Sequence, residues 1–285
     1  MLEQQIINGL SQGMLYALMA TGLTIIFGVM HIVNFAHGEF YMLGAYITLI
    51  ASTFLGLPWI IAVALAAGAA FVFGMGTEMT LLRSVRGSHM LNKALLMIGL
   101  SFVLQNLALA IAGGKTRDIA FSWEGINISM PVIEATLTLE HVFAIALSLA
   151  AFMCLYFGLY KTKMGKSVRA TFENEQSAAL VGVNINRVHS LTFGIGGMLA
   201  GLAGALLGTM FLVNPEMGTQ AIVKSFIVVI MGGFGSIPGA IIGGVSLGLI
   251  ENLGSAYVSG QYKDVFGFII VIVVLLVRPQ GLMGK

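Results

Sequence analysis

Charge is the scarcest property of this 285-residue chain. Only 9% of its residues are Asp, Glu, Lys or Arg, whereas 58% are hydrophobic and the mean hydropathy is +0.95. A soluble globular domain has about 25% charged residues, and no soluble core buries so large an apolar fraction. The composition therefore excludes a soluble domain, and the net charge of +2 gives no support for a nucleic-acid partner.

Cysteine and catalytic motifs are also scarce. The single Cys154 lies inside an apolar run, so an internal disulfide is impossible. The sequence contains no HExxH or CxxC pattern, and no G-x-S-x-G in the strand-to-helix context that a catalytic serine requires. The fragment Gly165-Lys166-Ser167 lacks the first glycine of a phosphate-binding loop, because Tyr160 occupies that position. We therefore predict no catalytic residue, no metal site and no cofactor.

Long apolar runs make up most of the chain. A helix needs about 20 residues to cross a hydrocarbon layer about 30 Å thick. Charge-free length predicts membrane segments at 4–30, 39–56, 58–80, 91–112, 140–160, 191–213, 222–236, 239–257 and 264–278. We expect one transmembrane domain over residues 1–285, an all-α polytopic bundle of eight or nine segments. Because the start lacks a positively charged n-region, we expect a retained first helix and not a cleaved signal.

Basic residues indicate which loops face the cytoplasm. Eight of the fourteen Lys and Arg residues lie in two loops, with Arg83, Arg86 and Lys93 in one and Lys161, Lys163, Lys166, Arg169 and Arg187 in the other. Two segments separate these loops, so both lie on the same side. The N-terminus and the 113–139 loop are therefore expected outside the cytoplasm.

The run 222–236 is short for a membrane segment and contains Lys224 near its start. If it crosses the membrane, the chain has nine segments and a cytoplasmic C-terminus. If it re-enters, the chain has eight segments and the C-terminus lies outside. Arg278 and Lys285 favour the crossing. Irregular backbone at membrane depth must be covered by protein or line a water-filled cavity, so this run is also a candidate wall of a permeation path.

One polar stretch, residues 161–190, interrupts the apolar runs. Residues 173–176 form a polar first turn, since acidic residues are favoured near a helix N-terminus. Ala178 and Ala179 follow, and Gly182 is expected to end the helix. We predict a short cytoplasmic helix whose small-residue face fits a cleft in a partner. The alternative is a solvated connector, for which about thirty residues is long.

Three motifs along the chain resemble a known family. They are Asn34-Phe35-Ala36-His37-Gly38-Glu39, then Gly232-Gly233-Phe234-Gly235-Ser236-Ile237-Pro238-Gly239, and finally Arg278-Pro279-Gln280-Gly281. In this order, with the cytoplasmic helix between the first two, they resemble the LivH-type permease subunit of bacterial branched-chain amino acid ABC importers. The resemblance covers nearly the whole chain.

The resemblance implies an inner-membrane pore subunit with several partners: a second homologous permease, two cytoplasmic ATPases, a periplasmic substrate-binding protein and the lipid bilayer. It also implies that the ATPases dock on the cytoplasmic helix. The implied coupling residues are Glu173, Asn174, Glu175, Ala178, Ala179, Gly182 and Val183. The wider importer signature is Glu-Ala-Ala, three residues and Gly. Here Gln176-Ser177 precedes the alanines and only two residues separate them from Gly182, so the match is loose.

Ionisable and glycine-rich positions in the membrane segments are candidate path or gate residues. They are Asn34, His37, Gly38, Glu39, Gly232, Gly233, Gly235, Ser236 and Glu251. His37 and Glu39 lie where the first apolar run meets the second, and a gate, a proton relay and a helix cap all stay open for them. Glu78 lies close to Arg83 and is expected to reach the membrane interface.

We therefore predict a passive pore subunit of an importer for branched-chain or related amino acids, driven by ATP hydrolysis in its partners. The alternative is a proton-coupled secondary amino acid transporter in which Glu39, His37 or Glu251 carries the proton. Such transporters usually have paired intramembrane charges and internal repeats, and the sequence shows neither clearly. It leaves open whether the ligand is an amino acid, an amide or a urea-like solute, and whether the pore is a homodimer or a heterodimer.

Overall fold

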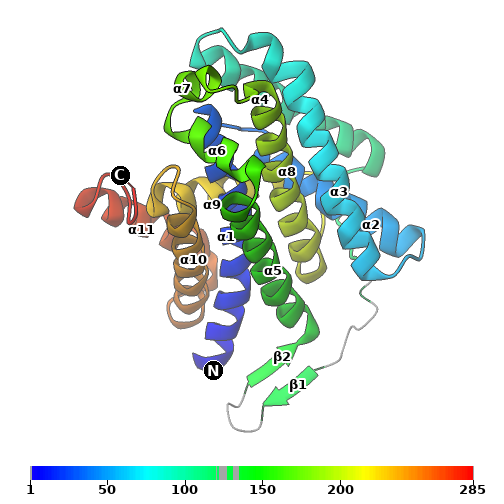
Figure 1. Ribbon diagram of the computed structural model, residues 1–285. Helices are drawn as coiled ribbons and strands as arrows, with labels where there is room; N and C mark the ends of the chain where they lie inside the picture. The colour runs from blue at the N-terminus through cyan, green and yellow to red at the C-terminus, as the bar shows by residue number, and fades with distance from the viewer. Residues whose placement is uncertain (1, 120, 122–126, 131–134, 285) are drawn as a thin grey trace.

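The computed structural model of the protein describes residues 2–119, 121, 127–130 and 135–284. Within these residues the chain forms α1 (Leu2–Met30), α2 (His37–Leu49), α3 (Trp59–Thr77), α4 (Met90–Ala112), α5 (Leu139–Lys161), α6 (Lys163–Glu173), α7 (Glu175–Leu180), α8 (Ile185–Met210), α9 (Met217–Gly232), α10 (Ile237–Tyr257) and α11 (Lys263–Val277). A β-hairpin of β1 (Asn127–Met130) and β2 (Ala135–Thr138) precedes α5 (Figure 1). Parts of the predicted outer loop lie outside the described residues.

The predicted all-α membrane bundle is confirmed. Among the described residues, seven helices are long and apolar enough to cross a membrane, namely α1, α3, α4, α5, α8, α10 and α11. The helices α2 and α9 are shorter, and α2 continues through a π-helical turn to Phe54. These nine helices coincide with the nine predicted segments. Pro58 immediately precedes α3 and Gly113 follows α4, as Pro and Gly do at helix ends.

The two ends of the bundle have different structures. The helices α6 and α7 lie at one end, whereas the N-terminus and the β-hairpin lie at the other (Figure 1). The C-terminal tail lies against the last turn of α9, where the amides of Leu282 and Met283 donate to the carbonyls of Met231 and Gly232 over 2.8 and 3.0 Å. The turn after α9 contacts α6 through Phe172. The helix α9 therefore ends on the α6 side, as the crossing interpretation predicts.

Two long helices, α1 and α8, form the centre of the bundle, with α10 packed along α1 and α3 packed along α8. Glycines allow this contact. A Cβ on Gly13 of α1 would lie 2.8 Å from the Cα of Val245 in α10, so no larger residue fits there without a backbone shift. By contrast, α4 buries only Met97 and Leu104 and stands at the edge. Close packing thus accounts for glycines inside these membrane helices.

Two parts of the chain share one design, which the sequence analysis did not detect. In both α1–α3 and α8–α10, a long helix is followed by a non-helical break, a short helix and a helix with a proline at its start. Each break contains the same turn. The Asn34 side-chain oxygen accepts from the amide of Ala36 over 3.1 Å, and that of Asn214 accepts from the amide of Glu216 over 3.0 Å. Asn34 and Asn214 are separated by the same number of residues as the two prolines, Pro58 and Pro238.

The two copies run in opposite directions through the bundle. The end of α1 contacts α6 through Gly28, whereas the end of α8 leads to Val213, which pairs with Arg117 in the outer loop. The short helices α2 and α9 begin beside each other inside the bundle, where Gly38 touches Gly218. Oppositely oriented repeats with broken helices at mid-membrane are a recurrent design of transport proteins. The fold thus places two helix breaks next to each other at its centre.

Candidate functional site

The cytoplasmic segment forms two helices joined at Asn174. The Asn174 side chain accepts a hydrogen bond from the amide of Ser177 over 2.8 Å and so caps α7. Gly182 ends the turn after α7 with a φ of +87°, a conformation that glycine adopts at little cost. The structure therefore contains the short capped helix that the sequence predicts, together with α6, a second helix before it that the sequence analysis read as flanking residues.

The small-residue face of α7 does not point outward as a whole. Ala178 is only 3% exposed and packs against the permease itself, whereas Ala179 is exposed. The segment also presents two large apolar side chains to solvent, Leu180 at the end of α7 and Val181 immediately after it, which are 89% and 79% exposed. Sequence reasoning missed both, because it assigned the docking surface to the alanines. An exposed apolar pair at the tip of a polar segment is the signal that could have found them.

An ion-pair cluster joins the loop after α3 to the start of α8. Glu78, at the end of α3, is fully buried and pairs with Arg83 over 3.2 Å and with Arg86 over 2.6 Å. Ser190 of α8 donates to the same carboxylate. The expectation that Glu78 reaches the membrane interface is therefore replaced by a buried position, where two cations and a hydroxyl satisfy its charge.

Some of the predicted coupling residues lie close to this cluster. Glu175 of α7 lies 3.8 Å from the ring of His189 in α8. Glu173 ends α6, and Val183 follows Gly182 in the turn that leads to α8, where its amide donates to the carbonyl of Ala178 over 3.1 Å. The segment thus contacts α8 through Glu175 and continues into it through Val183, so a displacement of α7 reaches that helix.

A second contact joins the cytoplasmic segment to the centre of the bundle. The ring of Phe172 in α6 lies against Gly28 near the end of α1 and against Gly235 in the turn between α9 and α10. A Cβ on Gly28 would overlap this ring, and one on Gly235 would lie 3.1 Å from it. Phe172 therefore touches the cytoplasmic ends of both repeats.

The block 34–39 lies deeper than the sequence suggests. His37 is fully buried, and its Nε2 atom donates to the carbonyl of Met19 in the middle of α1 over 3.0 Å. Glu39 is 1% exposed, accepts a hydrogen bond from Ser101 of α4 over 2.9 Å, and lies in the first turn of α2, where the helix dipole favours its charge. Gly38 touches Gly218. The four predicted residues of this block therefore lie inside the bundle, at the break between α1 and α2.

The glycine block after α9 forms a packed turn on the α6 side. A Cβ on Gly232 would overlap the backbone of Gly239, and one on Gly233 would overlap the C-terminal tail. Ser236 caps α10 by accepting from the amide of Gly239 over 3.1 Å. The structure places these residues in backbone contacts that leave no space for a side chain. They lie apart from the block 34–39.

Glu251 belongs to a polar cluster inside the bundle. It is fully buried and pairs with Lys224 of α9, and the hydroxyl of Tyr16 in α1 donates to it over 3.1 Å. Lys224 also pairs with Asp264 of α11 over 2.7 Å. Sequence reasoning proposed Glu251 alone. The signal for its partner was the single charge, Lys224, inside the otherwise charge-free run 222–236.

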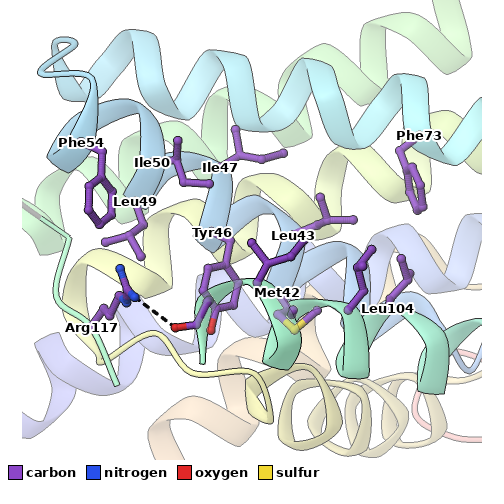
Figure 2. Close-up of a pocket in the computed structure, with 14 residues that line it drawn as sticks. Met42, Leu43, Tyr46, Ile47, Leu49, Ile50, Phe54, Phe73, Leu104 and Arg117 are labelled. Atoms are coloured by element: carbon purple, nitrogen blue, oxygen red, sulfur yellow. Dashed lines mark hydrogen bonds between the residues drawn. The ribbon is translucent and has the colours of Figure 1, made fainter. Parts of the chain in front are cut away.

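A separate apolar cavity of about 350 Å³ lies between α2, α3 and α4 (Figure 2). Arg117 is the only charged residue among those that line it, and it donates to the carbonyl of Ala112 over 3.0 Å. Ile50 and Phe54 at its edge are 48% and 60% exposed. The cavity is therefore an apolar surface with one cation, and its lining offers no carboxylate to an amine.

Two clusters of charged side chains occur in the part of the bundle that the structure describes. Among the described residues, no three His, Cys, Asp or Glu side chains gather as metal ligands. The charged groups that do gather form a cytoplasmic cluster around Glu78 and a membrane cluster around Glu251. The first cluster links the end of α3 to α8, and the second links α1, α9, α10 and α11. A movement of these helices would therefore change the contacts within each cluster.

The comparisons with known proteins agree with this architecture. Residues 5–275 match the family model described as "Branched-chain amino acid transport system / permease component". The chain is 38% identical to the high-affinity branched-chain amino acid transport system permease protein LivH of Salmonella typhimurium, and 36% identical to BraD of Pseudomonas aeruginosa. Both alignments cover 99% of this chain and 95% of the relative.

A more distant relative is the ribose import permease protein RbsC of Escherichia coli, which is 26% identical over 95% of this chain and 84% of its own length. The family-model match spans nearly all of the membrane segments described above, from α1 to α11. The chain belongs to the family of branched-chain amino acid transport system permease components.

Proposed function

We propose that this protein is a permease subunit of an ATP-driven importer of branched-chain or related aliphatic amino acids in the inner membrane of a bacterium. The observation that carries the proposal is the tip of α7, where Leu180 and Val181 expose an apolar pair on a polar cytoplasmic segment that is anchored to α8. Family membership supports this ATP-driven function over the proton-coupled alternative.

In this proposal the protein receives mechanical work and performs no hydrolysis itself. Two ATPase subunits bind the tips of two α7 helices and approach each other when they bind ATP. Their movement displaces α7, and the contact of Glu175 with His189 carries the displacement to α8. Phe172 carries it to the ends of α1 and α9 through Gly28 and Gly235. Access then changes from the outer side to the cytoplasmic side.

The proposed partners correspond to surfaces of the structure. The tip of α7 faces the ATPases. A second permease subunit and lipid cover the apolar side chains that α4, α5 and α11 expose, of which Ile111 and Leu276 are 76% and 80% exposed. A periplasmic binding protein delivers the amino acid at the opposite end of the bundle, near the β-hairpin and the N-terminus. The candidate gate is the contact between the block 34–39 and the start of α9, where Gly38 touches Gly218.

The experiment that tests the coupling site is the replacement Leu180→Asp. A charge at this position removes apolar contact area from the ATPase interface, and because the side chain is 89% exposed it costs the isolated permease little stability. We expect the ATPases to be lost from the complex during purification in mild detergent, and ATP-dependent leucine uptake into proteoliposomes to fall at least tenfold.

The matched control is Ser84→Asp, which adds the same charge at an exposed position of another cytoplasmic loop. It should keep both ATPase binding and uptake. If Leu180→Asp retains full uptake while a proton uncoupler abolishes it, the coupling role and the ATP-driven function are both wrong.

A further inference from the structure

A polar cavity of about 240 Å³ lies in the outer half of the bundle. Its walls come from the middle of α1, from α2, from the outer end of α8, from α9 and from the first turn of α11. The apolar part of the wall includes Leu15, Met19 and Met217, and the polar part includes Tyr16, Tyr41, Lys224, Lys263 and Asp264. The cavity is separate from the coupling segment. None of the candidate path residues is among those that line it, but Lys224, the partner of Glu251, is.

Two lysines, Lys224 and Lys263, and two carboxylates, Glu251 and Asp264, lie in and beside this cavity, but they do not form two separate ion pairs. Lys224 lies between two carboxylates, those of Glu251 and Asp264. In the part of the chain that the structure describes, the ammonium of Lys263 has no carboxylate within ion-pair distance, and its hydrogen-bond partner is the neutral side-chain oxygen of Gln12 over 3.0 Å. An ammonium has three donors. Lys263 therefore keeps donors that no anion satisfies.

The carboxylate of Asp264, the next residue, can also bind a ligand. The side chain of Asp264 is 75% exposed and is bound only on one side, by Lys224 over 2.7 Å. Lys263 and Asp264 are adjacent residues at the start of α11, so a cation and an anion stand side by side at the edge of one small cavity. The net charge of the four groups is zero, which disfavours a ligand with net charge and favours one that carries both signs.

The position of the cluster argues against a purely structural role. Buried ion pairs cost desolvation energy that apolar packing of the same volume avoids, and ionisable residues within membrane segments are usually functional. Here Lys224, Lys263 and Asp264 border a cavity, and only Glu251 is fully enclosed. Tyr41, from α2, also lines the cavity and is only 5% exposed. The cluster thus resembles a small binding site with charged groups at one end and apolar walls.

We propose that this cavity is a binding site for a zwitterionic α-amino acid on its way through the permease. The ammonium of Lys263 binds the ligand carboxylate, and the carboxylate of Asp264 binds the ligand ammonium. The aliphatic side chain lies against Leu15, Met19 and Met217. This inference rests on the proposed function, which supplies the ligand class, and adds a site within the permease that selects for the two charges common to all amino acids.

The test is the equilibrium binding of radiolabelled leucine to the purified permease–ATPase complex in lipid nanodiscs, without the binding protein. Lys263→Gln should weaken leucine binding at least tenfold, because a charge-assisted hydrogen bond is replaced by a neutral one. Asp264→Asn should weaken it to a similar degree, and its exposure makes misfolding a small risk. Leucinamide, which lacks the carboxylate, should bind wild type weakly and bind Lys263→Gln equally weakly.

The matched control is Lys115→Gln, which removes an exposed lysine from the outer loop, away from the cavity. It should leave leucine binding unchanged. If Lys263→Gln and Asp264→Asn both bind leucine like wild type, or if wild type binds no leucine, the inference is overturned. ATP-dependent leucine uptake by wild-type proteoliposomes with binding protein decides the proposed function separately, since that uptake can persist when the binding result is negative.

Discussion

The two helix breaks of this protein have the same local structure and different surroundings. Both contain an asparagine turn, after which a short helix begins. In the first break Asn34 and His37 are buried, at 1% and 0% exposure. In the second, Asn214 lines the open polar cavity together with Gln220. The repeat thus supplies two equivalent breaks, of which one is enclosed by helices and the other borders a cavity.

This difference separates two roles that broken helices have in transport proteins. A break can leave backbone groups available to a ligand, or it can allow two helices to approach each other closely. The first break allows α2 to approach α9 closely, because Gly38 lies against Gly218. The second is positioned to serve a ligand, because Lys224 lies two turns into α9 and faces the cavity. Substitutions at equivalent positions should therefore have unequal effects.

The largest difference is expected between Gly38→Ala and Gly218→Ala. A Cβ on Gly38 would overlap the carbonyl oxygen of Gly218, which is backbone and cannot rotate away. A Cβ on Gly218 would lie 2.8 Å from Oε2 of Glu39, a side-chain atom that can shift, and 2.9 Å from the carbonyl oxygen of Gly38, a smaller overlap than that of a Cβ on Gly38 with the Gly218 carbonyl oxygen. We expect Gly38→Ala to lower the free energy of unfolding by about 3 kcal/mol and Gly218→Ala by about 1 kcal/mol.

Thermal unfolding of the purified protein in detergent measures both changes. Gly68→Ala is the control, because no atom lies within 4 Å of the added Cβ and alanine favours a helix. It should be neutral or stabilising. Equal losses for Gly38→Ala and Gly218→Ala would show that the two breaks are packed alike.

The next difference concerns coupling, at two glycines that precede the breaks. A Cβ on Gly28 would displace the ring of Phe172, which is 43% exposed and free to move outward. Gly28→Ala should therefore cost little stability but reduce leucine-stimulated ATPase activity about fivefold, since it breaks the contact between α6 and α1. At the equivalent Gly208, a Cβ would meet Ile119 at 2.9 Å, on the side away from the ATPases. Gly208→Ala should leave coupling unchanged, and a similar loss in both variants would contradict the role of Phe172.

The fold could be predicted largely from the sequence, because in lipid the length of an apolar run determines where a helix crosses. The seven long helices follow from this rule, and the predicted runs also overlap the two shorter helices α2 and α9, which begin inside the bundle. The repeat could not be predicted, since it consists of a backbone design that few identical residues mark. The turn residues Asn34 and Asn214 occupy equivalent positions, but the residues that follow them, Phe35 and Pro215, differ.

The candidate site could be predicted only in part, and for physical reasons. The position of the cytoplasmic helix follows from its polarity, but which face it buries depends on the packing of Ala178 against the bundle. The depth of His37 depends on a chain that turns back into the membrane after α1, which charge-free length does not reveal. Lys224 and Glu251 pair across two helices, and a single sequence contains no record of that contact.

The asparagines test the turn itself. Asn34→Ala and Asn214→Ala each remove a side chain that accepts from a backbone amide at a break, and the loss of such a bond costs about 0.5–2 kcal/mol. We expect the upper end of this range for Asn34, where no solvent replaces the lost partner, and the lower end for Asn214. Chemical denaturation in mixed micelles measures the difference. Asn106→Ala, at an exposed position of α4, is the control, and equal losses at both breaks would show that enclosure adds nothing.

The smallest effect is expected at Glu39, the acidic residue of the enclosed break. Glu39→Gln keeps the shape of the side chain and can still accept from Ser101, so ATP-dependent leucine uptake should change by no more than about twofold. Ser101→Ala, which removes the donor from α4, should have an effect of similar size. A proton carrier behaves differently, because glutamine cannot bind and release a proton, and uptake would then collapse in Glu39→Gln but survive in Ser101→Ala. That pattern, together with uptake driven by a pH gradient in the absence of ATP, would give the enclosed break the active role that this comparison assigns to the open one.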